Sequence, residues 1–402
     1  MKKGKILCFC LILLLLGGCT QDKVSSGSAE KTEDGFQTYF MYDILIDAGE
    51  GFYYTDSHGF LYYFDYQSEK NSIVCNKSNC KHEDWSEDTP VEERCLAYVG
   101  GMSTGFVYGK KLYIMEKGFG DGRTSFGKIR IVESDLDRTN QREVQTMDCD
   151  SIYSYAVRDG ILYASVDRNL IRKQDDGSAE VSEMRICSLC SIDLSDGTVE
   201  TLIEKENNNS VIRIMGAEED SLYLNYCYFE NPFDGTNFQE AKQHNEYYQY
   251  SVETGSLQEI LKDMQESQIL TASLVNGKLF ACTAPNNLTM TEGETIVYEL
   301  KRISPDTGEE AVLARTTDNI RLFRSCAIYK KDGEEGGFVY DFRQDREMPA
   351  PKMKLDDFST YAMAGDYFYG VLYDEQTQEY PSCFILLDDL MEGKDKFVMV
   401  HY

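Results

Sequence analysis

Seven copies of one short motif constrain the fold of this chain more than any other feature. In each copy a Gly or Asp is followed closely by an apolar–aromatic pair. The copies are GFYY (51–54), GKKLY (109–113), DGILY (159–163), DSLY (220–223), GKLF (277–280), GGFVY (336–340) and DYFY (366–369). A short alternating stretch precedes each copy, and most are followed by two more alternating segments joined by turn residues, a pattern typical of antiparallel hairpins. Four strands recurring at about 50 to 60 residues predict the blade of a β-propeller.

We therefore predict an all-β protein with a single β-propeller over residues 36–402, built from four-stranded antiparallel blades. Seven blades match the seven motifs, and six or eight are the alternatives because the sixth unit is short. The 28 tyrosines and 20 phenylalanines supply the packing between neighbouring blades. Helical periodicity is weak, with residues 256–267 as the best helix candidate. Because an open ring leaves sheet edges unpaired, residues 36–47 and 396–402 are expected to close it.

The first residues have the anatomy of a secretory signal. Lysines precede an apolar run, Ile6–Leu16, whose 11 residues are too few to cross about 30 Å of hydrocarbon as a helix. The sequence LGGC (16–19) matches a bacterial lipobox, so residues 1–18 are predicted to be a lipoprotein signal peptide and Cys19 to carry the lipid. The polar segment up to residue 35 is then a flexible tether. The alternative is an ordinary signal peptide with a chance cysteine.

The net charge of −29 bears on partners. Nucleic acids and anionic lipid surfaces are repelled by such a domain, so neither is expected as a direct partner. The charge is interpreted as a source of solubility. The more specific alternative is that it attracts cations or basic ligands. The protein is expected to be a monomer on the extracytoplasmic face of the cell membrane, held there by its lipid.

One stretch, CNKSNCKHEDWSEDTPVEERC (75–95), could hold a metal. Its Cys75, Cys80, His82 and Cys95 form a Cys3His set of the kind that binds structural zinc, and four protein ligands leave no open position for catalysis. A disulfide between two of the cysteines is the competing interpretation because exported proteins favour disulfides, and free thiols are the third. Trp85 is expected to pack under this loop.

Long loops and the Cys-rich connection are predicted to share one face of the propeller. In a four-stranded meander, the loops between second and third strands and the connections between blades lie on the same side. Loops on a rigid scaffold usually carry binding, so this face is predicted to be the interaction face; tolerated insertions without a role are the alternative. The ligand-binding candidates are Trp85, Phe119, Phe126, Phe233, Phe238, His244 and Tyr247.

No catalytic residue can be assigned from the sequence. Ser103 lies in a G-x-S-x-G match, but a strand follows where a nucleophile elbow needs a helix. His244 lacks an identifiable partner for acid–base chemistry. Cys187 and Cys190 form a C-x-x-C on a strand, where their side chains point to opposite faces. Residues 135–140 begin like a calcium loop but lack its Gly and distal Glu, which predicts a hairpin turn.

These residues together support a family resemblance. The lipobox, the tether, the DGILY-type units and the segment VCNKSNCKH…CLAY resemble β-propeller lipoproteins of Gram-positive anaerobes. The repeats are similar to those of TolB-like and low-density-lipoprotein-receptor-like propellers. The resemblance implies a fold and a location, not an activity. We expect a binding or scaffold module for a protein, peptide or glycan, with structural zinc as the one cofactor considered; the alternative is a propeller hydrolase or lyase acting at the channel mouth.

Overall fold

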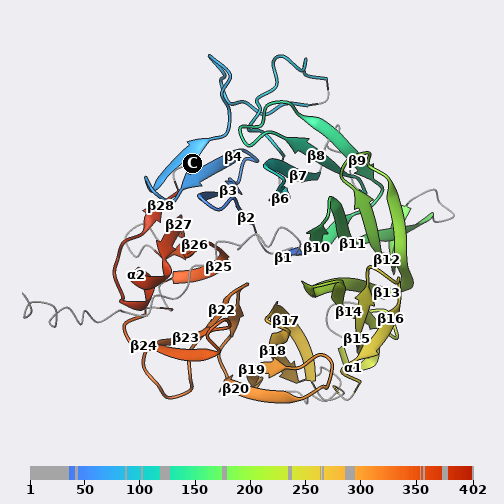
Figure 1. Ribbon diagram of the computed structural model, residues 1–402, viewed down its shortest axis with the longest axis vertical. Helices are drawn as coiled ribbons and strands as arrows, with labels where there is room; N and C mark the ends of the chain where they lie inside the picture. Colours follow the sequence, from blue (N-terminus) through green and yellow to red (C-terminus); the bar gives the residue numbers. More distant parts are fainter. Residues whose placement is uncertain are drawn as a thin grey trace, which may run out of the picture.

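The computed structural model confirms the all-β prediction. It describes residues 36–40, 44–86, 88–100, 103–117, 127–173, 179–233, 238–262, 264, 267–285, 295–353, 355, 358–373 and 379–400. Figure 1 shows antiparallel sheets arranged radially around a common axis, as in a β-propeller. Among these residues, two short helices accompany the sheets, α1 (Phe238–Ala241) and α2 (Leu387–Met391). Within the described residues, no helix is long and apolar enough to cross a membrane.

Five of the sheets have four strands each, in chain order from the inside outward. They are β2 (Leu45–Asp47), β3 (Gly51–Thr55), β4 (Leu61–Asp65) and β5 (Lys70–Ile73); β6 (Thr104–Tyr108), β7 (Lys111–Lys117), β8 (Ile129–Ser134) and β9 (Arg142–Met147); β17 (Ser267–Val275), β18 (Lys278–Pro285), β19 (Tyr298–Ile303) and β20 (Glu310–Thr316); β21 (Arg321–Leu322), β22 (Cys326–Tyr329), β23 (Gly337–Asp341) and β24 (Arg346–Ala350); and β25 (Phe358–Ala364), β26 (Tyr367–Leu372), β27 (Ser382–Leu386) and β28 (Val398–Met399).

The sixth sheet has eight strands because one long strand serves two units. Its order is β1 (Gln37–Phe40), β10 (Ser151–Arg158), β11 (Ile161–Lys173), β12 (Ala179–Asp193), β13 (Val199–Glu218), β14 (Ser221–Phe229), β15 (Gln243–Ser251) and β16 (Leu257–Ile260). The first half of β13 pairs with β12, and the second half pairs with β14. The register shifts next to Asn209, which adopts a left-handed φ of 46°. Asn tolerates this conformation better than most residues, so the strand changes partner without a loop.

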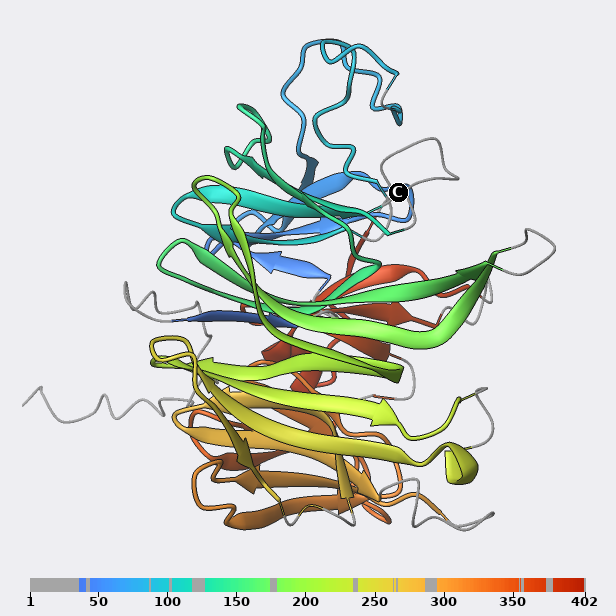
Figure 2. The same cartoon turned by 90° about the vertical axis from the view of Figure 1, so that its right-hand side faces the viewer.

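Six of the seven sequence motifs fall on the second strands of these units, and GGFVY (336–340) falls on β23, the third strand of its short unit. The strands concerned are β3, β7, β11, β14, β18, β23 and β26. The aromatic side chains of these strands pack between sheets, as predicted. The best helix candidate, by contrast, begins with strand β16. The long loop expected after β11 is largely an extended β11–β12 hairpin, which Figure 2 shows projecting from one side of the ring.

Packing of the first sheet against the last closes the ring. Phe52 on β3 meets Phe384 on β27 in an edge-to-face contact with ring centroids 4.8 Å apart, and both rings are fully buried. The expectation that residues 36–47 act together at this joint is wrong for β1. That strand pairs with β10, from Gln37 opposite Val157 to Phe40 opposite Ser154. Because β10 is the first strand of its unit, β1 lies near the centre of the ring (Figure 1).

The two faces of the ring differ in their connections. We call the side with the turns between first and second strands the turn face, and the opposite side the loop face. The Cys-rich connection between β5 and β6 was expected on the loop face. Figures 1 and 2 show instead that it projects outward from the rim of the ring, beside the first two sheets.

Candidate metal centre

The structure brings the four predicted ligands of the Cys-rich loop together. One ligand atom from each of Cys75, Cys80, His82 and Cys95 lies within 4.8 Å of the other three. The Cys95 Sγ is 3.5 Å from His82 Nδ1. A tetrahedral zinc with bonds of about 2.0–2.3 Å needs ligand atoms roughly 3.5–4 Å apart. The set therefore requires only a small contraction to surround such an ion.

Local backbone geometry builds this cluster. The N–H of Val74 donates to the carbonyl of Leu61 at 3.0 Å, which holds the chain to the first sheet just before Cys75. Beyond it, Asn79 and His82 both adopt left-handed φ angles, 59° and 54°. These two residues bend the chain on either side of Cys80. Asn and His are among the non-Gly residues that adopt this conformation most readily, so both residues suit these bends.

The thiols differ in their preference for a proton. Burial would raise the pKa of Cys75, but backbone N–H groups of Lys77 and Leu96 outweigh it, and the pKa is lowered. Burial is the main reason why the pKa of Cys95 rises to about 12, and negative charge on Cys75 adds to it. A cation among the sulfurs would offset both the burial and the mutual repulsion of thiolates. The described cysteines are all free thiols.

Contacts within the loop explain the position of Trp85. Its Nε1 donates to the carbonyl oxygen of Cys95 at 3.0 Å. Its ring meets Tyr98 edge to face at 5.8 Å, and the Arg94 guanidinium lies 4.6 Å above it. On the other side of the loop, Lys77 Nζ donates to the Arg94 carbonyl at 2.7 Å. Trp85 therefore packs inside the loop, as the sequence suggested.

The turn between β8 and β9 holds both ends of the loop from the second sheet. Asn76 Nδ2 donates to Asp137 Oδ2 at 2.9 Å, next to Cys75. Arg138 Nε donates to the Leu96 carbonyl at 3.3 Å, next to Cys95. Arg138 is itself fixed by an ion pair with Glu116. The sequence predicted this hairpin turn correctly but not its contact with the Cys-rich loop. Residues so distant in sequence form no local pattern from which a contact could be predicted.

The other predicted ligand-binding residues lie apart from this centre. Tyr247 is 1% exposed, and its hydroxyl accepts the N–H of Ile269 at 3.0 Å, so its ring belongs to the core rather than to a ligand surface. His244 lies on strand β15, not in a loop. It stacks on Tyr228 at 5.0 Å, with its Nε2 3.6 Å from a Glu230 oxygen.

Phe233 also lies in this region, where it stacks on Phe229 at 4.5 Å. Four further predicted positions cannot be placed, since Cys19, Phe119, Phe126 and the side chain of Phe238 lie outside the described residues.

The remaining candidates for a catalytic or redox role, Ser103 and the pair Cys187 and Cys190, have contacts typical of structural residues. The Ser103 hydroxyl donates to the Val99 carbonyl at 2.7 Å, and strand β6 follows it directly. Cys187 and Cys190 are both buried, and they belong to different hydrophobic clusters on opposite faces of β12. This arrangement keeps the two sulfurs apart and gives no redox pair.

Comparison with known proteins gives similarity only to solved structures. No protein-family model matches the chain, and no curated protein matches it. An oligogalacturonate lyase in complex with manganese is 11% identical, with a TM-score of 0.42 over 78% of this chain and 77% of that one. An oligogalacturonate lyase from Vibrio parahaemolyticus is 10% identical, with a TM-score of 0.44 over 84% and 87%. A TolB-like protein from Agrobacterium tumefaciens is 10% identical, with a TM-score of 0.37 over 70% and 88%. Similarities this low concern the fold and transfer no activity to this chain.

Proposed function

We propose that this protein is a membrane-anchored extracytoplasmic lipoprotein whose seven-bladed propeller acts as a binding or scaffold module. We further propose that a structural zinc ion lies in its Cys-rich loop (residues 75–95), called the rim loop below. The convergence of Cys75, Cys80, His82 and Cys95 carries the zinc assignment. Four protein ligands complete a tetrahedral shell, so the ion would shape the loop and would not activate a substrate. Five four-stranded sheets, and the division of the eight-stranded sheet into two units that share β13, support the count of seven blades.

The entry point of the chain supports an orientation for the anchored protein. Phe36, the first described residue, meets the Tyr163 ring edge to face at 5.7 Å and lies 5.5 Å from the Arg158 guanidinium. Arg158 ends strand β10, so this contact is on the turn face. A lipid on Cys19 would then be tethered to the turn face, which leaves the loop face free for a protein, peptide or glycan partner.

The alternative of a propeller enzyme has less support. A hydrolase or lyase at the channel mouth needs paired titratable groups there. The pocket near the ring's axis is lined by one carboxylate, Asp47, and by no histidine among its described lining residues. The geometry therefore favours binding over acid–base catalysis.

Metal analysis of the purified full-length chain tests the zinc proposal. We expect one zinc ion per chain by mass spectrometry of the metal, lost in Cys80→Ser. Cys190→Ser is the matched control, because its sulfur lies 4.0 Å from the Thr201 hydroxyl and away from the rim loop. That variant should keep its zinc. A metal-free chain with a disulfide between two loop cysteines would contradict the proposal.

Lipidation needs a separate test in cells. We expect Cys19→Ser to abolish incorporation of labelled fatty acid and to move the protein out of the membrane fraction. Cys80→Ser should leave both readouts unchanged. Unaltered membrane association of Cys19→Ser would show that the cysteine is not the anchor.

A further inference from the structure

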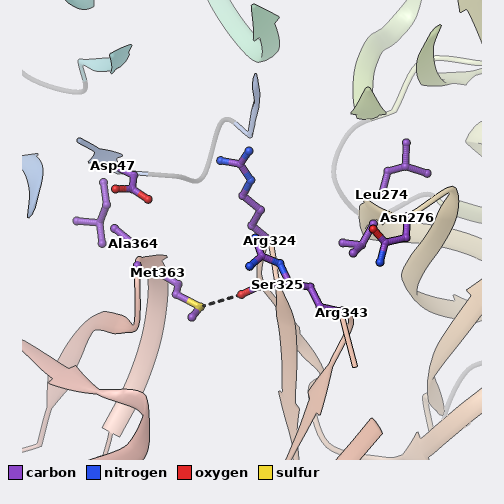
Figure 3. Close-up of a pocket in the computed structure, with 11 residues that line it drawn as sticks. Asp47, Leu274, Asn276, Arg324, Ser325, Arg343, Met363 and Ala364 are labelled. Atoms are coloured by element: carbon purple, nitrogen blue, oxygen red, sulfur yellow. Dashed lines mark hydrogen bonds between the residues drawn. The ribbon is translucent and has the colours of Figure 1, made fainter. Parts of the chain in front are cut away.

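A second site lies near the axis of the ring, away from the rim loop. A pocket of about 240 Å³ forms where the inner strands of four sheets end on the turn face. Its lining comes from segments far apart in sequence, among them those that carry Asp47, Asn276, Arg324, Arg343 and Met363. We call it the axial pocket. Only the closed ring brings these segments together, and Figure 3 shows their side chains around a common space.

Two arginines at this pocket stand out in a chain of net charge −29. Arg324 comes from the connection between β21 and β22, and Arg343 from the turn between β23 and β24; both are exposed. Within the part of the chain that the structure describes, the Arg343 guanidinium forms no ion pair. Lys111, at another turn of this face, instead pairs with Asp135 at 2.6 Å. The pocket thus offers positive charge to a ligand in an otherwise acidic protein.

A carboxylate faces these cations across the pocket. Asp47 ends strand β2, and its Oδ1 accepts the N–H of Gly49 at 2.8 Å. Burial raises the pKa of Asp47, while the positive charge of Arg324 acts in the opposite direction. Figure 3 shows Arg324 between Asp47 on one side and Asn276 on the other. Charges of both signs therefore line one small space.

This arrangement selects a ligand with two kinds of polar group. Guanidinium groups bind carboxylates through paired charge-assisted hydrogen bonds. Asp47 can accept hydrogen bonds from a hydroxyl or ammonium group but would repel a bare anion. Asn276 and Ser325 add hydrogen-bonding capacity, and Leu274 and Met363 provide apolar surface. The volume lies below the usual range of about 300–1,000 Å³ for drug-sized ligands.

We propose that the axial pocket binds a small carboxylic acid that also carries hydroxyl or ammonium groups, of the size of a single sugar acid or amino acid. Arg324 and Arg343 would hold the carboxylate, and Asp47 with Asn276 would hold the donor groups. The axial pocket is separate from the rim loop and from Cys19. The proposal for this pocket can therefore fail while the zinc and lipidation proposals hold, and the reverse.

Calorimetric titration of the purified full-length chain with D-glucuronate tests the site. D-glucose is the matched neutral probe, because the two sugars differ only in the carboxylate. We expect saturable binding of glucuronate and none of glucose. Inorganic phosphate should bind about tenfold or more weakly than glucuronate, because it lacks the extended donor groups that Asp47 requires. Equal binding of phosphate, or no difference between the two sugars, would overturn the proposal.

Variants locate the binding in the pocket. Arg343→Gln and Arg324→Gln are each expected to weaken glucuronate binding about tenfold or more. Arg315→Gln is the control, because Arg315 is 67% exposed on β20 and pairs with Glu299 on the outer part of its sheet. Thermal unfolding of each variant shows whether it remains folded. Folded Arg343→Gln and Arg324→Gln chains that bind glucuronate as well as the Arg315→Gln chain would refute the assignment.

Discussion

Arg138 Nη2 and Glu116 Oε1 lie 2.9 Å apart, with side chains only 1% and 2% exposed. Arg130 reaches the other oxygen of Glu116 at the same distance. Through its Nε, Arg138 also donates to the Leu96 carbonyl. The buried ion pairs of Glu116 in the second sheet are thereby connected to the rim loop that carries the candidate metal ligands.

Breaking this pair should strongly destabilise the protein. Arg138→Met leaves the Glu116 carboxylate buried with one partner fewer, and we expect a loss of about 3–5 kcal/mol in the free energy of unfolding. Urea denaturation measures it. Adding Glu116→Leu to the same chain removes the buried carboxylate but also the ion pair of Arg130, so it should recover only part of this loss. A single variant as stable as the parent would show that the pair does not stabilise the fold.

Ring closure should depend on the aromatic contact between the first and last sheets. Phe52→Ala removes a fully buried ring that touches Phe384, and we expect a cost of about 3–5 kcal/mol in unfolding free energy. Tyr361→Ala is the control, since this side chain is exposed on β25. It should change stability by about 0.5 kcal/mol or less. Similar losses for both variants would argue against a closing core at this joint.

The junction in β13 should depend on the conformation of Asn209. Asn209→Ala forces a residue with a poor left-handed preference into φ 46°, with an expected cost of about 1–2 kcal/mol. Asn209→Gly should cost less, because Gly adopts left-handed conformations readily. Both variants lose the hydrogen bond to the Phe233 carbonyl, so their difference isolates the backbone effect. Thermal unfolding that ranks Gly below Ala would contradict this account.

A buried carboxylate should make stability depend on pH. Burial raises the pKa of Asp167 above its unfolded value, although Arg185 opposes the shift. The folded protein then holds this proton more tightly than the unfolded chain, so the contribution of Asp167 to stability falls as pH rises from about 4 toward 7. Asp167→Asn removes that dependence. Its unfolding free energy relative to the parent should therefore increase over this range.

An exposed carboxylate provides a control of opposite sign. Hydrogen bonds from the Ser195 side chain and backbone lower the pKa of Asp193. Its contribution to stability is present at neutral pH and is lost on acidification. Asp193→Asn should thus lose stability relative to the parent as pH rises from about 2 to 5. Urea titrations of both variants across the two ranges should give slopes of opposite sign, and slopes of the same sign would contradict the assignment.

Local sequence patterns were sufficient to predict the strands and the ligand set. All seven aromatic motifs fall on strands, six of them on second strands, because alternating apolar residues next to turn residues favour one local structure whatever surrounds them. Cys75, Cys80, His82 and Cys95 lie close together in the chain, so their convergence was also foreseeable. The same reasoning could not recognise Tyr247 as a core residue. The local sequence around an aromatic residue does not show whether another part of the fold covers its side chain.

Only the tertiary structure decided the features that depend on contacts between distant segments. The pairing of β1 with β10, the continuation of β13 through two units and the hold of Arg138 on Leu96 each join residues with no local relationship. The axial pocket goes further, since its arginines and Asp47 meet only when the ring is closed. Sequence alone therefore determined the repeating unit, through propensity and hydrophobic alternation. The packing of the complete ring determined the contacts and the pocket that form between the units.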